Sequence, residues 1–335
     1  MQQLKLGIIG CGNMTRSHVG ALAKIDLVEV VAVADVVEES AREVAKLAGA
    51  GSVHADYREL LALREVQAVL ISSPHFLHKE MTVAALEAGK DVLCEKPMAI
   101  TVAECDEMLA TAGRTGRKLM VGQVLRLMPP FVQVRRMIAS GDLGKPLAAV
   151  INRVQGNPLR PRPVPADYWR RSRAKTGGML HETSVHEFDL LRSVFGEPAR
   201  VYARSASLLH PDSEFDDYNT VLIDFKAGGI ATLHGSYIGP IPNVGGTFTC
   251  EKGVVTYTWG REPSIRHQRY EDEKPTDTAV GEGFQTGLVA EDTMFARWVL
   301  EGEEPEITGW DGRQAIAMVE AAYESAGSDR AVKVQ

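Results

Sequence analysis

The feature that most constrains the fold is a unit that repeats through the first part of the chain. Each unit is a short unbroken apolar run, a turn, and a longer stretch with helical spacing. The apolar runs are residues 6–9, 28–34, 66–71, 92–94 and 119–121; the helical stretches include 36–48, 77–88 and 102–112. A strand that is apolar at every position is buried on both faces, which requires helices on both sides of a parallel sheet. The pattern therefore predicts a doubly wound α/β domain.

A different pattern begins after about residue 125. Residues 218–225 alternate between apolar and polar, turn at a glycine pair, and continue as a second strand over 230–237. A further pair of strands, 246–250 and 254–258, flanks another glycine-containing turn. Strands of period 2 joined by such turns form antiparallel hairpins. We therefore expect an α+β domain with a large, mainly antiparallel open sheet.

The length of 335 residues is typical of two domains. We predict that residues 1–125 form the doubly wound domain and residues 126–335 form the α+β domain. Two late helical stretches, 287–300 and 312–325, either complete the second domain or pack back on the first.

Composition excludes several classes of protein. With 44% hydrophobic and 24% charged residues the chain is neither disordered nor a coiled coil, and a net charge of -7 provides no overall cationic field for nucleic acid or an anionic membrane. No apolar run approaches the ~20 residues that span a bilayer, and Met1 leads directly into a hydrophobic strand, so we expect a cytoplasmic protein. Four widely spaced cysteines indicate reduced thiols; they are Cys11, Cys94, Cys105 and Cys250.

A glycine-rich turn follows the first strand. Gly10 and Gly12 permit a tight turn and a bare backbone that a pyrophosphate can approach at a helix N-terminus. Thr15 stands at the third small position of this Rossmann fingerprint, a departure that we expect to loosen the packing of the helix on the strand. The turn predicts a dinucleotide site; the alternative is a structural turn without a ligand.

Asp35, 23 positions after Gly12, ends the second strand. An acid there hydrogen-bonds the ribose hydroxyls of the cofactor, and no Lys or Arg follows in residues 36–40 to neutralise the 2′-phosphate of NADP. NAD is therefore favoured over NADP. The alternative is that Asp35 only caps the following helix.

Later motifs make a resemblance specific. They are Ser73-Pro74-His75 after the apolar run 66–71, Glu95-Lys96-Pro97 after the run 92–94, and Gly177-Gly178 with His181-Glu182 and His186 downstream. Together with the glycine turn they resemble the glucose-fructose oxidoreductase, inositol dehydrogenase and rhizopine catabolism (Gfo/Idh/MocA) family, over essentially the whole chain.

The resemblance implies roles for individual residues. Lys96 matches the catalytic lysine, which its two neighbours hold beside the nicotinamide, with a Lys–Pro bond that is often cis. His186 matches the catalytic histidine, and Glu182 stands where the family commonly has an aspartate. Arg126 falls near an arginine-containing stretch that borders the active site.

The residue types support the same chemistry independently. Glu182 and His186 are four apart and would share one face of a helix, and with Lys96 they form a workable proton-transfer set. We expect His186 or Lys96 to exchange a proton with a substrate hydroxyl, and Glu182 to orient His186. The alternatives are a core histidine at 186 and a carboxylate at 182 that only pairs with a surface cation.

The predicted cofactor contacts are Gly10, Gly12, Asn13, Met14, Asp35, Ser73, Pro74, His78, Glu95, Lys96 and Gln123. His78 has a structural alternative at the start of its helix. We expect no metal, because His181 and His186 are five apart and not four, as a zinc-binding helix requires.

A cationic arm precedes the glycine pair. Its members are Arg160, Arg162, Arg170, Arg171, Arg173 and Lys175. Arg126, Trp169 and Arg170 are the predicted substrate contacts, through an anionic group or by stacking on a sugar ring. The alternative is a solvated arm or a subunit contact.

We therefore predict an NAD-dependent dehydrogenase acting on a sugar, inositol or related polyol, assembled as a homodimer or homotetramer through the C-terminal sheet. One alternative is a redox-neutral enzyme that oxidises a sugar transiently before elimination or glycoside cleavage. Another is a dinucleotide-binding regulator without turnover.

Overall fold

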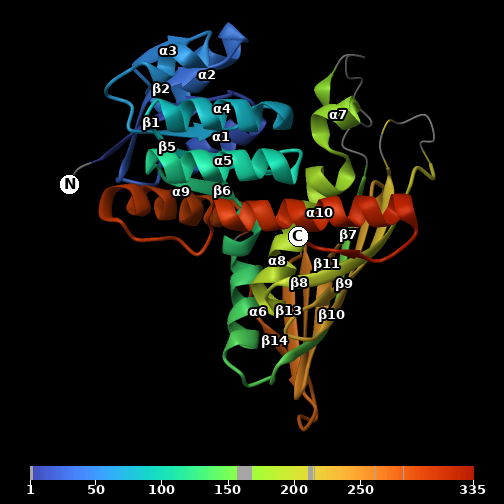
Figure 1. Cartoon of the computed structure of the whole chain (residues 1–335). Coiled ribbons are helices and arrows are strands. Elements are labelled where there is room, and N and C mark those ends of the chain that lie inside the picture. Colours follow the sequence, from blue (N-terminus) through green and yellow to red (C-terminus); the bar gives the residue numbers. More distant parts are fainter. Residues whose placement is uncertain (1–2, 157–167, 210–213, 215, 261, 282) are drawn as a thin grey trace. The chain divides into compact units, whose positions relative to one another are not determined.

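The computed structural model describes residues 3–156, 168–209, 214, 216–260, 262–281 and 283–335. The chain divides into two compact units, coloured along the sequence in Figure 1. The first unit comprises Met1–Leu127 and Phe284–Arg313, and the second comprises Met128–Gly283 and Gln314–Gln335.

A six-stranded parallel sheet forms the centre of the first unit, in the order β3-β2-β1-β4-β5-β6. Its strands are β1 Leu4–Ile9, β2 Val28–Ala34, β3 Ser52–His54, β4 Ala68–Ile71, β5 Asp91–Glu95 and β6 Leu119–Gly122. The helices are α1 Asn13–Leu22, α2 Glu38–Ala48, α3 Tyr57–Leu61, α4 His78–Glu87 and α5 Val102–Thr115, with 3-10 turns η1 His75–Leu77 and η2 Val124–Leu127. The predicted doubly wound domain is confirmed (Figure 1).

The chain order in this sheet determines where a ligand can bind. From β1 the chain moves to β2 and β3 on one side and then crosses to β4, β5 and β6 on the other. Ligands of open α/β sheets bind at the carboxyl ends of the strands where this reversal occurs. In this sheet that point lies between the ends of β1 and β4.

A late helix, α9 Phe284–Glu301, also belongs to the first unit. Its Phe295 and Ala296 are buried in the same core cluster as Leu4 and Ile8 of β1. The sequence analysis assigns residues 126–335 to the second domain, with the late helices as possible exceptions. Helical spacing reveals that a helix has a buried face but not which distant element covers it.

A nine-stranded sheet forms the second unit, in the order β14-β13-β12-β11-β7-β10-β9-β8-β15. Its strands are β7 Pro146–Gly156, β8 Pro198–Ala206, β9 Tyr218–Phe225, β10 Ile230–Ser236, β11 Ile238–Cys250, β12 Gly253–Trp259, β13 Ser264–Arg269, β14 Thr276–Thr278 and β15 Val332–Lys333. Among the described residues of this sheet, only the β7–β10 pair is parallel, and the other paired strands are antiparallel. The predicted hairpins β9–β10 and β11–β12 are both present.

Helices cover one face of this sheet. They are α6 Pro129–Ala139, which contacts β12 and β13, and α8 Val185–Phe195, which contacts β7. The second unit also contains three short segments, η3 Trp169–Arg171, α7 Arg173–Thr176 and the π-helical turn η4 Leu180–Ser184. The last helix is α10 Gly309–Ser328. Its residues up to Arg313 belong to the first unit, and its residues from Gln314 belong to the second.

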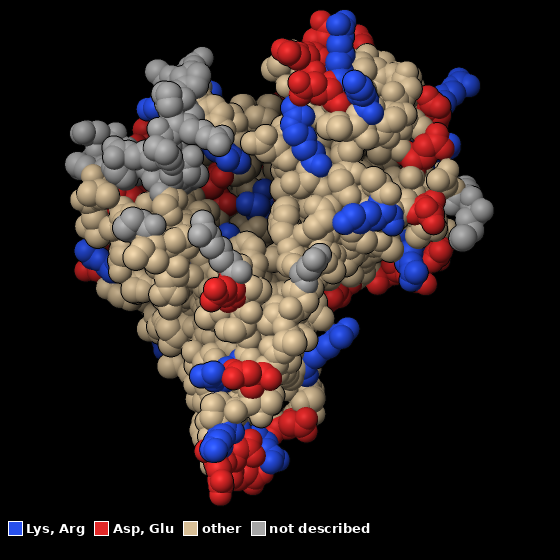
Figure 2. Space-filling view, turned by 180° about the vertical axis from the view of Figure 1, so that it is seen from behind, with Lys and Arg blue, Asp and Glu red and all other residues tan. Residues whose placement is uncertain are grey.

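Other features bear on the predictions from composition. All four cysteines are buried and free. Among the described residues no helix is both long and apolar enough to cross a membrane. On the face drawn in Figure 2, basic side chains lie beside acidic ones and much of the surface is uncharged, so the charge of this face is mixed in sign.

Candidate active site

The glycine turn after β1 is closed by local contacts. Gly10 has a φ of +92°, and a Cβ there would lie 2.5 Å from the carbonyl oxygen of Ser72. Thr15 is fully buried, and its hydroxyl donates to the carbonyl oxygen of Gly10 at 2.5 Å. The Thr15 hydroxyl therefore closes the turn, and its effect on the packing of α1 against β1 stays a prediction.

Gly12 differs from Gly10 in what surrounds it. It precedes α1 with extended backbone angles, φ -81° and ψ -167°. A Cβ on Gly12 would meet no atom of the described residues within 4 Å. The backbone therefore faces open space at a helix N-terminus, where free amides and the helix dipole favour an anion.

Asp35 is fixed at the end of β2. Its Oδ2 accepts a hydrogen bond from the amide of Cys11 at 2.7 Å, and its Oδ1 accepts one from the amide of Val37 at 2.8 Å. The helix α2 begins later, at Glu38, and has no side-chain cap. The carboxylate thus joins the end of β2 to the glycine turn and does not cap the helix.

His78 connects the ends of β4 and β5. The side chain is fully buried, with Nε2 2.9 Å from the carbonyl oxygen of Ser73 and Nδ1 2.8 Å from that of Pro97. Burial lowers the pKa of His78, so the neutral ring is favoured. These contacts support the structural alternative for His78, and its cofactor role stays a prediction.

Three features of the first unit fit a bound dinucleotide. The open backbone at Gly12 and the held carboxylate of Asp35 are two. The third is the hydroxyl of Ser73, which is buried and has no hydrogen-bond partner among the described residues. The other predicted contacts follow the ends of the same strands: Asn13 and Met14 begin α1, Pro74 follows β4, and Gln123 follows β6.

Lys96 follows directly after β5. Its amide donates to Oε2 of Glu95 at 3.0 Å, and the Glu95 carboxylate is buried. The Lys96–Pro97 peptide bond is cis, as the resemblance implied. Lys96 is thus attached to a strand end whose neighbouring side chain is itself fixed.

The Gly177-Gly178 pair in the second unit has a packing explanation. Both residues have positive φ, and a Cβ on Gly177 would lie 2.4 Å from His181, while one on Gly178 would lie 2.4 Å from the hydroxyl of Tyr323. His181 stacks on Tyr323 with ring centroids 5.9 Å apart. The glycines therefore let the turn before His186 pack closely on α10.

Glu182 lies in the π-helical turn η4 and His186 in the first turn of α8, so the two do not share one regular helix. Oε1 of Glu182 is 3.3 Å from Nε of Arg170, which makes an ion pair between two predicted site residues. The guanidinium of Arg170 also lies over the ring of Trp169, 5.0 Å from its centroid. The orientation of His186 by Glu182 stays a prediction.

The cationic arm is only partly described. Arg160 and Arg162 lie outside the described residues. Arg173 lies over Tyr323, with its guanidinium carbon 4.5 Å from the ring centroid.

A buried ion pair that the sequence analysis does not predict joins Arg153 and Glu187. Nη1 of Arg153, on β7, is 3.3 Å from Oε1 of Glu187, on α8, and both side chains are largely buried. Arg153 also lies 5.4 Å from the ring centroid of Trp259. A charged residue within a sheet strand was the available signal, but its partner is fixed only by tertiary packing.

Arg126 is held inside the first unit. Its Nη2 is 3.0 Å from Oδ1 of Asp311, and its Nη1 donates to the carbonyl oxygen of Glu306 at 2.9 Å. The side chain is 4% exposed. A substrate contact through Arg126 stays a prediction, and the ion pair indicates a structural role.

Comparisons with known proteins agree with these features. Residues 4–123 match the Gfo/Idh/MocA model described as an oxidoreductase family with an NAD-binding Rossmann fold, and residues 131–256 match the C-terminal domain model of that family. An uncharacterized oxidoreductase, ORF334 of Rhizobium meliloti, is 32% identical over 70% of this chain and 68% of its own length. Myo-inositol 2-dehydrogenase of Thermotoga maritima is 28% identical over 99% of both chains.

The fold also matches a solved structure. Levoglucosan dehydrogenase in complex with NADH superposes with a TM-score of 0.90 over the full length of both chains, at 24% identity. This likeness concerns the fold alone. From the two family models and the similarity to the Rhizobium oxidoreductase, the chain belongs to the Gfo/Idh/MocA family of oxidoreductases.

Proposed function

We propose that this chain is an NAD-dependent dehydrogenase that transfers hydride between a hydroxyl-bearing carbon of a sugar, inositol or related polyol and nicotinamide. The observation that carries the proposal is the glycine turn of the first unit, open at Gly12 and joined to the fixed carboxylate of Asp35. The name of one relative, myo-inositol 2-dehydrogenase, supports the substrate class.

The side chains have separate tasks in this proposal. Bound NAD would accept or donate the hydride. Oxidation of an alcohol also needs a base for the hydroxyl proton, and Lys96 or His186 takes that proton. The positive charge of Lys96 stabilises the oxygen as its negative charge develops. Glu182 and Arg170, already paired, would bind neighbouring hydroxyl groups.

Asp35 accounts for the choice of cofactor. NADP carries a phosphate on the ribose hydroxyl that such a carboxylate binds, and the two negative charges would repel each other. Both oxygens of Asp35 are held by backbone amides, so the carboxylate cannot rotate away without losing hydrogen bonds. We therefore propose NAD as the cofactor.

The test is incubation of the purified chain with NAD and a panel of inositols, levoglucosan and hexoses, followed at the absorbance of reduced nicotinamide. NADH formed in proportion to the oxidised substrate is the expected result. A changed sugar without net NADH would replace the proposal with a redox-neutral reaction. Tight NAD binding with no product would replace it with a regulatory role.

We further propose that the chain assembles through the face of the large sheet opposite α6 and α8. Apolar side chains stand exposed on neighbouring strands of that face, with Val150 53%, Leu222 40% and Ile230 51% exposed. Thr232 of β10 pairs with both Val150 of β7 and Leu222 of β9, so Val150, Thr232 and Leu222 lie in one row across the strands, and Ile230 lies two residues along β10 on the same face. Apolar surface of this kind is typical of a subunit contact.

A further inference from the structure

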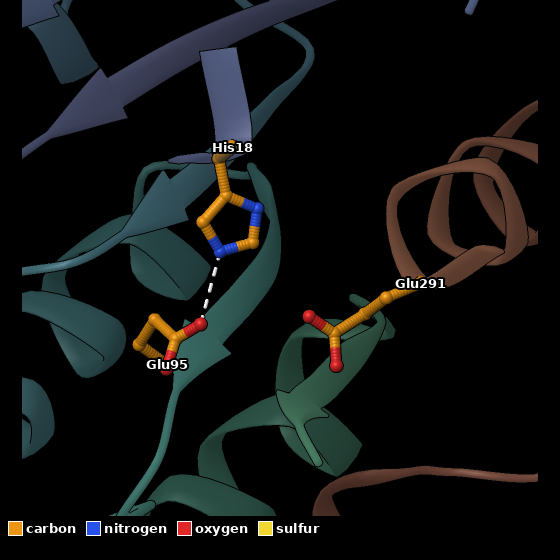
Figure 3. Close-up of side chains that lie close together, drawn as sticks. All are labelled: His18, Glu95 and Glu291. Carbon is orange, nitrogen blue, oxygen red and sulfur yellow. Dashed lines mark hydrogen bonds and ion pairs between the residues drawn. The ribbon is translucent and has the colours of Figure 1, made fainter. Parts of the chain in front are cut away.

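A buried histidine in the first unit has no part in the function proposed above. His18 lies on α1 and is fully buried. Its Nε2 is 2.9 Å from Oε1 of Glu95 on β5, and its Nδ1 is 2.9 Å from Oδ1 of Asp292 on α9. Figure 3 shows the His18–Glu95 contact, with the carboxylate of Glu291 on the side of α9.

The contacts determine the charge of the ring. A neutral imidazole has a single N–H, whereas ionised carboxylates only accept hydrogen bonds. Burial by itself lowers the pKa of His18, but the charges and hydrogen bonds of Asp292 and Glu95 outweigh it and raise the pKa well above 6.5. His18 is therefore an imidazolium that donates to both carboxylates.

The side chain of Glu95 is held at both of its carboxylate oxygens. Oε1 accepts from His18, and Oε2 accepts from the amide of Lys96 at 3.0 Å. The side chain also packs against Gly122 of β6, where a Cβ would lie 3.0 Å from Oε1. On the other side of Lys96, His78 contacts the carbonyl oxygen of Pro97. The backbone of Lys96 is thus held at both flanking residues.

We propose that His18 and Asp292 are positioning residues for Lys96. Asp292 holds His18, His18 holds the Glu95 carboxylate, and Glu95 holds the Lys96 amide, so the series fixes the point from which the lysine side chain extends. The assignment of a catalytic task to this position rests on the proposed function. Groups that orient a reacting side chain typically change rates about 10- to 100-fold when removed.

A divalent cation is the alternative occupant of this cluster. One ligand atom each of His18, Glu95 and Glu291 lie within 4.8 Å of one another, and all three residues are buried. A metal needs a lone pair on an imidazole nitrogen. Both nitrogens of His18 already contact carboxylates, so a metal would have to displace one of them, and the ion-paired imidazolium fits the geometry better.

The test compares Asp292→Asn and His18→Gln with a matched control, Asp91→Asn. Asp91 is also a buried carboxylate, at the opposite end of β5, and its Oδ1 accepts from the amide of Lys118 at 2.8 Å. We expect the first two variants to lower kcat about 10- to 100-fold, with the Kd for NAD within about twofold of the wild type. Asp91→Asn should lose stability while its kcat stays within about twofold.

Gly122→Ala is a second route to the same position if the buried variants fail to fold. Its methyl group would press on the Glu95 carboxylate and leave His18 and Asp292 intact. We expect a loss of kcat without a change in NAD affinity. Equal kcat in Gly122→Ala and the wild type, or equal losses in Asp292→Asn and Asp91→Asn, would overturn the proposal.

A measurement on Lys96 itself separates this proposal from the proposed function. Competitive acetylation with isotope-labelled acetic anhydride, read by mass spectrometry, gives the pH at which the Lys96 amine is half titrated. The charged groups of the cluster beside Lys96 are Glu95, Asp292, Glu291 and His18. A change in their charge or position changes the electrostatic potential at the Lys96 amine and therefore the pH at which it titrates. We expect a shift of about half a pH unit or more in Asp292→Asn and none in Asp91→Asn.

The two failures are then distinct. A wild type that turns over no polyol contradicts the proposed function, while the acetylation profile still tests the positioning. Identical profiles in Asp292→Asn and the wild type would contradict the positioning, and so would a stoichiometric divalent metal in the purified chain, because it would occupy one nitrogen of His18.

Discussion

The carboxylate of Asp35 is a fixed negative charge beside the glycine turn, and its effect can be isolated by mutation. Asp35→Ala removes the repulsion of a 2′-phosphate and the hydrogen bonds to Cys11 and Val37. We expect the preference for NAD over NADP to fall about 10-fold or more, as ratios of kcat/KM for the two cofactors. An unaltered ratio would mean that another residue reads the ribose.

Lys96 is the residue on which the proposed chemistry depends most. Lys96→Ala removes a positioned acid or base and a charge that stabilises the substrate oxygen. We expect kcat to fall at least ~100-fold while the Kd for NAD changes little, measured by steady-state kinetics and by calorimetric titration with NAD. His186→Ala is the companion variant from the second unit, and the larger loss of the two identifies the proton-exchanging group.

The turn between β1 and α1 contains two glycines, and we expect a side chain to be unfavourable at each for a different physical reason. Gly10→Ala meets a positive φ and the Ser72 carbonyl oxygen, so we expect a loss of about 1–3 kcal/mol in the free energy of unfolding. Gly12→Ala meets open space. It should leave the unfolding midpoint in urea unchanged and weaken NAD binding. Normal NAD affinity in Gly12→Ala would argue against a pyrophosphate at this turn.

Local sequence predicts some helices and strands of this chain well and others poorly. The strands β1, β2, β4, β5 and β6 and the hairpins β9–β10 and β11–β12 follow from periodicity, which is a property of neighbouring residues. The short β3 and α3 were not predicted, because elements of three and five residues carry too few periodic positions. The π-helical turn at Leu180–Ser184 was not predicted either. It follows Gly178, which packs against Tyr323 of the distant helix α10, and a contact of this kind leaves no pattern among neighbouring residues.

At the scale of the whole molecule, the buried charge of His18 should make stability depend on pH. The pKa of His18 is raised in the folded chain, so its contribution is fully present below about pH 6.5, the unfolded value, and is lost as the pH rises toward the folded value. The free energy of unfolding should fall by up to about 1.4 kcal/mol per pH unit above pH 6.5. Urea denaturation of the wild type and His18→Gln at several pH values measures this slope, which the variant should lack.

The exposed row on the large sheet leads to a prediction about assembly. Leu222→Lys places a charge in that row and should shift the chain toward the monomer in light scattering after gel filtration. Val36→Lys is the control, because Val36 is also apolar and is 88% exposed, but lies in the first unit. Dissociation by both variants, or by neither, would argue against a subunit contact on this face.

Local patterns in the sequence determined the parallel and antiparallel strands, the glycine turn and the placement of Asp35 and Lys96 at strand ends, since each depends on residues near one another in the chain. The meeting of His18 with Asp292, 274 positions away, was decided only by tertiary structure, as was the pairing of Arg153 with Glu187. The periodicity of a sequence does not indicate which buried charged residues will contact one another. Burial forces each such charge to take a partner, and the packing of distant elements determines which one is within reach.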